Sequence, residues 1–393
     1  MMTVVSRPTS GLVALSAGGT GGHLFPAEAL AQELAGRGFR IHLYTDRRVN
    51  RLLAGFPCEA VHEIASATFT ARPSPRTIAA MARLVLGFFQ ARRTLRRTGP
   101  VAVVGFGGYP TLPPLLAALT LGLPTVIHEQ NAVVGRANRL LARLVRAVAT
   151  GFSDPLHLPR SAEKKLTVTG NPVREAARAM RGRRYEQPAA GGELRLVVFG
   201  GSQGASVFAD VVPAAVADLP KPQRLRIVQQ CRPEDLARVN EAYANHGIEA
   251  ETAAFFPDLP HRIADAHLVI ARAGASTIGE LAAIGRPAIL VPLPHSLDND
   301  QLENARRYCR SGCGWLVEQD DFTPGHLGSL ITRLWYGNGE LSRAAAAAAR
   351  FGEGRAEKLL ADLVEGLVPG DSRQAAAPAV PADGPGDTSG EPT

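Results

Sequence analysis

Two stretches of the sequence, LVALSAGGTGGH at residues 12–23 and LRLVVFGGSQGA at residues 194–205, share one pattern and decide the fold class. Each begins with a short apolar run typical of a buried parallel strand and continues into a glycine cluster and a helical stretch. Parallel α/β domains repeat this order of strand, turn and helix. Because the pattern restarts after Gly191, we predict an α/β fold with two Rossmann-like domains.

The rest of the chain supplies further strands where short β-branched runs recur. We expect them at residues 41–45, 101–105, 125–128 and 147–150, and in the second half at residues 225–230, 266–271 and 288–291. A helix is expected over residues 26–36, after the first glycine cluster. Beyond Val368 the chain is rich in Pro, Ala, Gly, Ser and Asp, so a disordered tail is expected there.

The composition bounds the class of protein. A chain of 393 residues with 45% hydrophobic and 20% charged residues is a globular protein of two or three domains, which excludes a wholly disordered or fibrous chain. Its net charge of +7 favours anionic partners, among them nucleic acid, phosphorylated substrates and acidic membranes. Four cysteines are too few for a disulfide scaffold, and Cys309 and Cys313 lack the second pair of a zinc site.

Two apolar segments are candidates for export or membrane insertion. The run at residues 12–15 is too short for the core of a signal peptide. The uncharged stretch at residues 98–127 contains ten glycines and prolines, which a spanning helix would not tolerate well. We therefore predict a strand, a glycine turn, a short proline-started helix and a second strand in that stretch, and a soluble chain.

Three glycine clusters, at residues 18–22, 105–108 and 200–204, are candidate phosphate sites. A glycine turn exposes backbone N–H groups at a helix N-terminus, where the helix dipole favours anions. Glycine also permits close helix–strand packing, so a single cluster is weak evidence, but three in register with strands favour phosphate binding. No cluster has the complete G-x-G-x-x-G pattern or a Walker lysine, and only Asp46 suits a nicotinamide cofactor.

His23 and the segment His128-Glu129-Gln130-Asn131 place polar side chains at predicted strand ends. An imidazole beside an anion-binding turn can accept a proton from a substrate hydroxyl near neutral pH, although a histidine that only caps its helix fits the pattern equally well. The segment at 128–131 follows a strand at the carboxyl edge of a parallel sheet, where open α/β sheets bind ligands. A polar loop is the competing interpretation.

In the second half, the segment at residues 272–280 again follows an apolar strand. Glu280 lies about one turn into the expected helix, where a carboxylate can accept the two hydroxyls of a ribose or simply interact with the helix dipole. Arg272 is a candidate phosphate neighbour. Asp298-Asn299-Asp300 resembles the D-x-D of metal-dependent sugar transfer, but sugar contacts from Gln301 and Asn304 on one helix face are the preferred interpretation.

Residues 76–97 form a basic amphipathic helix candidate. Ile78, Met81, Val85, Phe88 and Phe89 recur near helical spacing, and the charge is supplied by Arg83, Arg92, Arg93, Arg96 and Arg97. The pattern is typical of a helix that docks on an anionic membrane surface, and equally of a core-packed helix with a solvated basic face.

Taken together, these motifs in this order resemble the MurG family of bacterial N-acetylglucosaminyltransferases over about residues 11–365. The match rests on the segments at residues 18–23, 107–110, 128–131, 170–174, 200–205 and 272–280. The resemblance implies a glycosyltransferase fold of the B type, in which the parallel sheets of the two domains face each other across a cleft. It also implies transfer of N-acetylglucosamine from UDP-N-acetylglucosamine to undecaprenyl-pyrophosphoryl-N-acetylmuramyl-pentapeptide in peptidoglycan synthesis, with neither a metal nor a cofactor.

Carried over motif by motif, the resemblance implies that the donor contacts Thr20, Gly21, Gly22, Asn131, Arg174, Ser202, Phe256, Ala275, Ser276, Thr277, Ile278, Gly279, Glu280 and Gln301. It implies an acceptor pyrophosphate site at Gly18, Gly19, Gly107, Gly108 and Tyr109. Relatives commonly have an aliphatic residue at the position of Phe256, and a glutamine or histidine at that of Asp300. A direct sugar contact from Asp300 is therefore not expected.

The implied reaction is attack of the muramyl C4 hydroxyl on the anomeric carbon of N-acetylglucosamine, with inversion and loss of UDP. His23 is the candidate general base, and Ser202 with Arg272 would stabilise the leaving pyrophosphate. The implied organisation is an acceptor- and membrane-facing domain at residues 1–170, a UDP-sugar domain at 171–343, a helix at 344–365 that returns to the first domain, and a disordered tail at 366–393.

The implied location is peripheral, on the cytoplasmic face of the inner membrane, with an anionic membrane surface as a partner and no nucleic acid. Three alternatives remain at this point. An isomerase of the UDP-N-acetylglucosamine 2-epimerase type shares the two-domain architecture and needs no lipid. A nicotinamide-dependent dehydrogenase is supported only by Asp46, and a non-catalytic sensor would bind the donor without releasing UDP.

Overall fold

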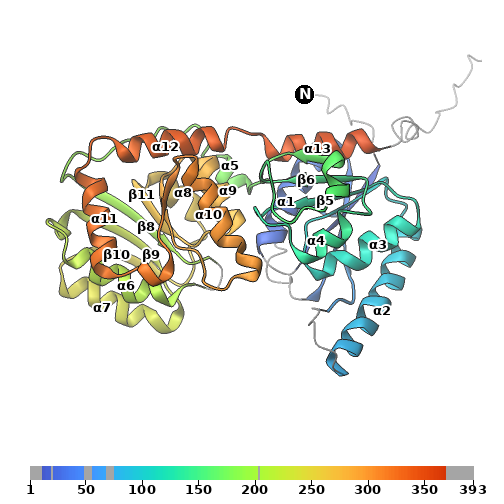
Figure 1. Ribbon diagram of the computed structural model, residues 1–393, viewed down its shortest axis with the longest axis horizontal. Helices are drawn as coiled ribbons and strands as arrows, with labels where there is room; N and C mark the ends of the chain where they lie inside the picture. The colour runs from blue at the N-terminus through green and yellow to red at the C-terminus, as the bar shows by residue number, and fades with distance from the viewer. Residues whose placement is uncertain (1–10, 19–20, 48–54, 68–74, 202–203, 369–393) are drawn as a thin grey trace, which may run out of the picture.

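The structure is a computed structural model that describes residues 11–18, 21–47, 55–67, 75–201 and 204–368. Two parallel sheets form two lobes side by side (Figure 1). The first sheet has the strand order β3-β2-β1-β4-β5-β6-β7 and the second the order β10-β9-β8-β11-β12-β13. The two-sheet α/β architecture predicted from the sequence is therefore confirmed.

The strands of the first sheet are β1 (Leu12–Ser16), β2 (Arg40–Thr45), β3 (Ala60–Glu63), β4 (Ala102–Gly105), β5 (Thr125–Glu129), β6 (Ala147–Thr150) and β7 (Leu166–Val168). Those of the second sheet are β8 (Leu194–Phe199), β9 (Leu225–Gln230), β10 (Glu249–Ala253), β11 (Leu268–Ala271), β12 (Ala288–Leu290) and β13 (Gly314–Leu316).

The α-helices of the first half are α1 (Gly21–Gly36), α2 (Pro75–Thr98), α3 (Leu112–Thr120) and α4 (Arg136–Leu141). Those that follow are α5 (Glu175–Arg178), α6 (Ser206–Ala217), α7 (Leu236–Asn245), α8 (Leu259–Asp265), α9 (Ala275–Ile284), α10 (Asp300–Arg310), α11 (Pro324–Tyr336), α12 (Glu340–Phe351) and α13 (Ala356–Leu367).

Each sheet has apolar side chains packed on both faces, which is why its central strands consist of nearly continuous apolar runs. Along β1, Val13 and Leu15 pack on the side of α1 and α13, whereas Ala14 packs on the side of α2 and α3. The second sheet alternates in the same way, with Leu196 and Val198 in one cluster and Val197 in the other. The apolar runs at residues 12–16 and 194–199 therefore specify the two sheet centres.

The structure of the first half matches one local prediction and differs from another. The stretch at residues 98–127 contains β4, a 3₁₀ turn at Tyr109–Thr111, α3 and β5, as predicted. None of the helices in the described ranges is both long enough and apolar enough to span a membrane. Helix α1 begins at Gly21, five residues before the expected Pro26, so His23 lies in its first turn rather than in the preceding loop.

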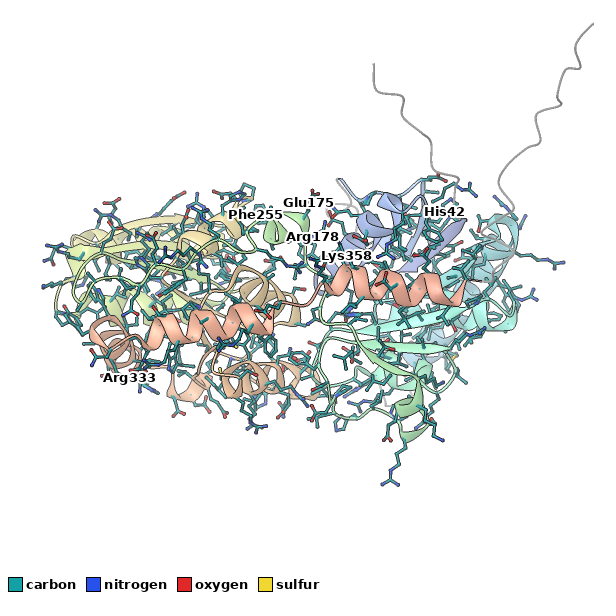
Figure 2. The ribbon with its side chains drawn as sticks, turned by 90° about the horizontal axis from the view of Figure 1, so that it is seen from above. His42, Glu175, Arg178, Phe255, Arg333 and Lys358 are labelled. Atoms are coloured by element: carbon teal, nitrogen blue, oxygen red, sulfur yellow. The ribbon has the colours of Figure 1, made fainter. Side chains whose placement is uncertain are left out.

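The C-terminal segment connects the two lobes. Helix α12 packs against α9 of the second half, and α13 lies on α1 of the first half (Figures 1 and 2). Leu360, Ala361 and Val364 of α13 are buried in the core of the first sheet. Arg37 of α1 holds the outer side of α13 through Asp362 at 2.6 Å and Glu365 at 2.9 Å.

Helix α2 projects from the first lobe (Figure 1) and exposes much of its apolar surface. Ile78 is 74% exposed and Phe89 is 61% exposed, and Met81, Val85 and Leu86 are also exposed. The helix is held to the lobe instead by residues of its C-terminal half, such as Ala91 and Leu95, which are buried. The alternative of a core-packed helix with only a basic face in water is therefore wrong for these large apolar side chains.

Candidate active site

A cavity of about 400 Å³ lies between the two lobes, where the carboxyl ends of both sheets meet. From the first half it is lined by the starts of α1 and α4 and by the turns after β4 and β5. From the second half it is lined by the start of α9 and by the segment leading into α10. The predicted residues among its lining are Gly22, His23, Gly107, Gly108, Tyr109, Asn131, Ala275 and Gln301.

The His23 imidazole lies in a cradle formed by three glycines. A Cβ atom added to Gly18 would lie 3.3 Å from Cδ2 of the ring, and one added to Gly107 would lie 3.2 Å from Cε1. A Cβ at Gly108 would lie 3.5 Å from Nε2. Gly107 and Gly108 also have φ of 90° and 76°, which L side chains rarely adopt. These glycines therefore leave room for the imidazole as well as exposing backbone N–H groups.

The surroundings of His23 keep its ring neutral at physiological pH. Burial lowers the pKa of His23, while the negative charges of Glu129 and Asp300 and the nearby Phe106 carbonyl and Gln130 side chain partly oppose this effect. The buried Nδ1 has no hydrogen-bond partner of ordinary geometry within the described ranges. A neutral imidazole at the wall of the cavity has the protonation state that a general base needs.

Glu129, a buried carboxylate at the end of β5, organises the loop that lines the cavity. It accepts hydrogen bonds from the Asn131 backbone N–H at 3.0 Å, the Gly135 N–H at 2.9 Å and Asn138 Nδ2 at 2.9 Å. Asn131 Nδ2 adds a fourth at 3.2 Å. Charge-assisted bonds of this number hold the loop in one conformation. Sequence reasoning proposed this segment as a ligand site but missed the positioning role of Glu129 and the participation of Asn138.

The two other polar residues of this segment point away from the cavity lining. His128 is fully buried and its Nε2 lies 3.0 Å from the Gly170 carbonyl oxygen, and burial lowers its pKa to about 4. Gln130 donates from Nε2 to the Phe106 carbonyl at 3.0 Å. Of the four polar residues, Glu129 and Asn131 therefore line the cavity and His128 and Gln130 do not, because alternate residues at a strand end face opposite sides.

Asn304 of α10 joins the two halves at the cavity. Its Nδ2 donates to Asn131 Oδ1 at 3.0 Å and to the Ala273 carbonyl at 3.1 Å, and its Oδ1 accepts from the Ala132 N–H at 2.8 Å. The side chain is fully buried. Its amide is therefore occupied by protein groups, so it positions Asn131 rather than offering the sugar contact considered from the sequence.

The wall of the cavity that belongs to the second half is built around the start of α9. Gly274 precedes the helix, and Gly274 and Ala275 line the cavity. Further along α9, Glu280 is buried and accepts two hydrogen bonds from Arg174, at 2.7 Å from Nε and 3.0 Å from Nη2. The Arg174 guanidinium also stacks 4.5 Å from the ring centroid of Phe25 in α1. The pair thus links α9 to the first half.

Several predicted donor residues do not line the cavity itself. These are Arg174, Phe256, Ser276, Thr277, Ile278, Gly279 and Glu280, while Gly18 and Gly21 flank it. Ser276 Oγ is buried without a hydrogen-bond partner in the part of the chain that the structure describes. Phe256 is buried beneath Arg262, whose guanidinium lies 4.4 Å from its ring centroid. Thr20, Gly19 and Ser202 lie outside the described residues.

Arg272, considered as a phosphate neighbour, is buried and bonded to protein groups. Its Nη1 donates to the carbonyls of Val291 at 3.1 Å and Pro292 at 2.9 Å, and its Nη2 donates to Gln319 Oε1 at 2.6 Å. Burial lowers its pKa. Most of its donors are therefore already used, and it does not line the cavity.

The Asp298-Asn299-Asp300 segment lies at the mouth of the cavity. Asp298 pairs with Arg139 at 3.0 Å and Arg136 at 3.4 Å, both on α4 of the first half. Asp300 lines the cavity, and burial raises the pKa of its carboxyl group. The resemblance described above gave no reason to expect this side chain in the lining. The structure's described residues contain no cluster of three or more His, Cys, Asp or Glu side chains suited to a metal ion.

Comparisons with known proteins agree with this architecture. The Glycosyltransferase family 28 N-terminal domain matches residues 13–150, and the family 28 C-terminal domain matches residues 195–360. A UDP-N-acetylglucosamine--N-acetylmuramyl-(pentapeptide) pyrophosphoryl-undecaprenol N-acetylglucosamine transferase of Methylobacterium sp. (strain 4-46) is 51% identical, over 92% of this chain and 98% of that protein.

Solved structures give the same picture. The crystal structure of Acinetobacter baumannii MurG is 30% identical, with a TM-score of 0.73 over 90% of this chain and 99% of that chain. A Listeria monocytogenes structure described as a UDP-N-acetylglucosamine 2-epimerase has a TM-score of 0.63 at only 14% identity, which shows a shared fold alone. The chain belongs to the MurG family of N-acetylglucosamine transferases.

Proposed function

We propose that this protein transfers N-acetylglucosamine from UDP-N-acetylglucosamine to the C4 hydroxyl of undecaprenyl-pyrophosphoryl-N-acetylmuramyl-pentapeptide, a step of peptidoglycan synthesis. The relatives' names state this chemistry, and the chain covers nearly their whole length. The observation in this molecule that carries the proposal is the neutral His23 imidazole, held by glycines at a cavity whose opposite wall is the start of α9.

The reaction divides between the two halves of the cavity. The acceptor hydroxyl attacks the anomeric carbon while His23 takes its proton, and UDP leaves from the opposite face of the sugar with inversion. Charge that develops on the leaving pyrophosphate is stabilised by backbone N–H groups at the helix starts and by hydroxyls such as the unpartnered Ser276 Oγ. Neither a metal, a cofactor nor a covalent intermediate takes part in this proposed step.

The proposed donor site extends from the cavity along α9. The Glu280 carboxylate has lone pairs left beyond its two bonds to Arg174 and would accept the ribose hydroxyls. Gln301 and Asn131 would contact the sugar. The remaining donor contacts are proposed at Thr20, Gly21, Gly22, Ser202, Phe256 and Ala275–Gly279, and the acceptor pyrophosphate site at Gly18, Gly19 and Gly107–Tyr109.

The proposed organisation keeps an acceptor domain at residues 1–170, a donor domain at 171–343 and a returning helix within 344–365. Helix α2 would place the acceptor domain on an anionic membrane surface at the cytoplasmic face. Its exposed apolar side chains can enter the interface while Arg92, Arg93, Arg96 and Arg97 attract acidic headgroups. Retention by vesicles of acidic lipid, with no retention by neutral vesicles at high salt, is the expected result.

The decisive experiment measures UDP release with and without a lipid-linked muramyl-pentapeptide acceptor. We expect UDP release only when the acceptor is present, together with a disaccharide product. Conversion of UDP-N-acetylglucosamine to its 2-epimer in the absence of acceptor would instead establish the isomerase alternative. Donor binding without any turnover would indicate the sensor.

A further inference from the structure

A second cavity, of about 590 Å³, lies in the first half and belongs to none of the contacts proposed above. Its charged wall is formed by Asp46 and Arg47 after β2, Glu63 at the end of β3, and Arg83 of α2. Leu86 and Gln90 line the cavity from the same face of α2 as Arg83. The cavity therefore opens at the same carboxyl edge of the first sheet as the His23 cradle.

Backbone contacts place this second cavity next to the catalytic one. Strand β2 is the neighbour of β1, and the Thr45 hydroxyl donates to the Ala17 carbonyl at 2.9 Å. Ala17 precedes Gly18, against which the His23 ring packs. Adjacent strands are about 4.8 Å apart, so the ends of β2 and β3 lie roughly 5–10 Å along the sheet edge from the end of β1.

The wall formed by α2 is firmly attached. Gly87 lies so close to the Ala65 carbonyl oxygen that a side chain there would collide with it, and Gln90 Oε1 accepts a hydrogen bond from the Ala65 N–H at 3.0 Å. Because the helix is fixed to the segment after β3 at these two points, Arg83 and Leu86 keep their position relative to Glu63. The cavity is therefore a formed part of the fold.

The charges of this cavity differ from those elsewhere on α2. Asp46 and Glu63 alternate with Arg47 and Arg83, and Arg47 pairs with Glu63 at 3.1 Å. Arg83 makes no hydrogen bond or ion pair with any other described residue. The two arginines of this lining are balanced by two carboxylates, so it does not favour phosphate as a purely basic site would, whereas a peptide offers both N–H donors and carboxylate acceptors.

The C-terminal half of α2 carries a different set of charges. There, Phe89 and four arginines, Arg92, Arg93, Arg96 and Arg97, line a surface hollow, and none of the described residues in its lining is acidic. A purely basic surface with an aromatic side chain suits lipid phosphates, so the mixed cavity and the basic hollow are suited to different ligands.

We propose that the second cavity binds the peptide stem of the acceptor, with Arg83 bound to a peptide carboxylate. This inference rests on the proposed function. The muramyl residue carries its peptide through the C3 ether, next to the C4 hydroxyl that must reach His23, so the stem starts close to the catalytic cavity. A pentapeptide spans at most about 17 Å when extended, which is enough to cross the two strand spacings and reach Arg83.

The test compares two water-soluble, short-prenyl acceptors, one with the pentapeptide and one without any peptide, in wild-type protein and in Arg83→Gln. We expect Arg83→Gln to raise the KM of the pentapeptide acceptor about tenfold, the usual effect of losing one partly exposed charge-assisted hydrogen bond. The KM of the peptide-free acceptor and that of UDP-N-acetylglucosamine should stay unchanged. The matched control is Arg160→Gln, an exposed arginine of the same half that lines neither cavity, and it should leave all three KM values unchanged.

Inhibition by the free pentapeptide gives a second readout that does not depend on turnover of the peptide-free acceptor. Its inhibition constant should rise about tenfold in Arg83→Gln and stay constant in Arg160→Gln. Equal losses with both acceptors, a loss seen only when acidic vesicles are present, or no change at all would each overturn the peptide assignment. Absence of transfer by the wild-type protein to either acceptor would instead refute the proposed function.

Discussion

The pair of Arg174 and Glu280 allows a prediction whose size follows from the geometry. Glu280→Ala leaves the Arg174 guanidinium without its carboxylate, which now lies 2.7 Å from Nε and 3.0 Å from Nη2. Breaking a fully buried pair costs about 3–5 kcal/mol. The Arg174 side chain is 26% exposed and keeps its contact with the Phe25 ring, so we expect a smaller loss of about 2 kcal/mol.

Stability and donor binding should change together in this variant. A loss of about 2 kcal/mol corresponds to a fall in Tm of roughly 4–8 °C for a domain of this size, measurable by scanning calorimetry. If Glu280 also accepts the ribose hydroxyls, the KM of UDP-N-acetylglucosamine rises about 10- to 100-fold. The acceptor KM should remain the same, because Glu280 lies on the donor side.

A double-mutant cycle with Arg174→Ala separates the pair from its surroundings. We expect a coupling of at least about 1 kcal/mol between the two substitutions. Glu357→Ala is the matched control, because buried Glu357 pairs with Arg181 at 3.0 Å but lies outside the proposed donor site. It should lower Tm without raising the donor KM. Additive effects of the two substitutions, or an equal rise of the donor KM in the control, would refute the reasoning.

Substitutions at four other residues test the site, its support and the membrane contact. His23→Asn should lower kcat about 10²- to 10⁴-fold. Because burial lowers the pKa of His23, the acid limb of the wild-type kcat/KM profile should lie below pH 6.5. For His128, the folded-state pKa of about 4 lies below the unfolded value of 6.5, so the unfolded chain binds more protons in this window. The free energy of unfolding should therefore fall by about 3 kcal/mol as pH drops from 6.5 to 4, and His128→Gln should remove this dependence in urea titrations. Asn304→Ala removes three hydrogen bonds and should lower kcat/KM at least about tenfold while leaving vesicle binding unchanged. Phe89→Ser should weaken flotation with acidic vesicles about five- to tenfold and leave transfer to a water-soluble acceptor unaffected.

The sequence predicted the central strands but missed four others, and these four share one physical property. β3, β7, β10 and β13 are the edge strands of the two sheets. Residues of β3 alternate between half-buried and exposed, and β10 includes Glu249 and Glu251. Continuous apolar runs arise only where both faces and both edges of a strand are covered, so edge strands have no comparable signal in the sequence.

The candidate site also contains features that the sequence pattern predicts and contacts that it does not predict. His23 and Asn131 were found because each follows a buried strand at a glycine-rich or polar turn, a pattern contained in a few consecutive residues. The partnership of Asn304 with Asn131 joins residues 173 positions apart, and the pairing of Glu280 with Arg174 joins residues 106 positions apart. No local spacing specifies such contacts, because they depend on how the two halves pack.

The contacts that join the halves also set the geometry of the reaction. Asn304 holds Asn131 against the start of α9, and Asp298 reaches Arg139 of α4 across the mouth of the same cavity. Separating the sheets would therefore break these bonds and move Asn131 away from the donor side in a single event. Because His23 belongs to one half and Glu280 to the other, the same contacts fix the distance between the proposed base and the proposed donor site. Alignment of the acceptor hydroxyl with the anomeric carbon thus depends on interdomain hydrogen bonds, which is why we expect Asn304→Ala to slow transfer although its amide touches neither substrate.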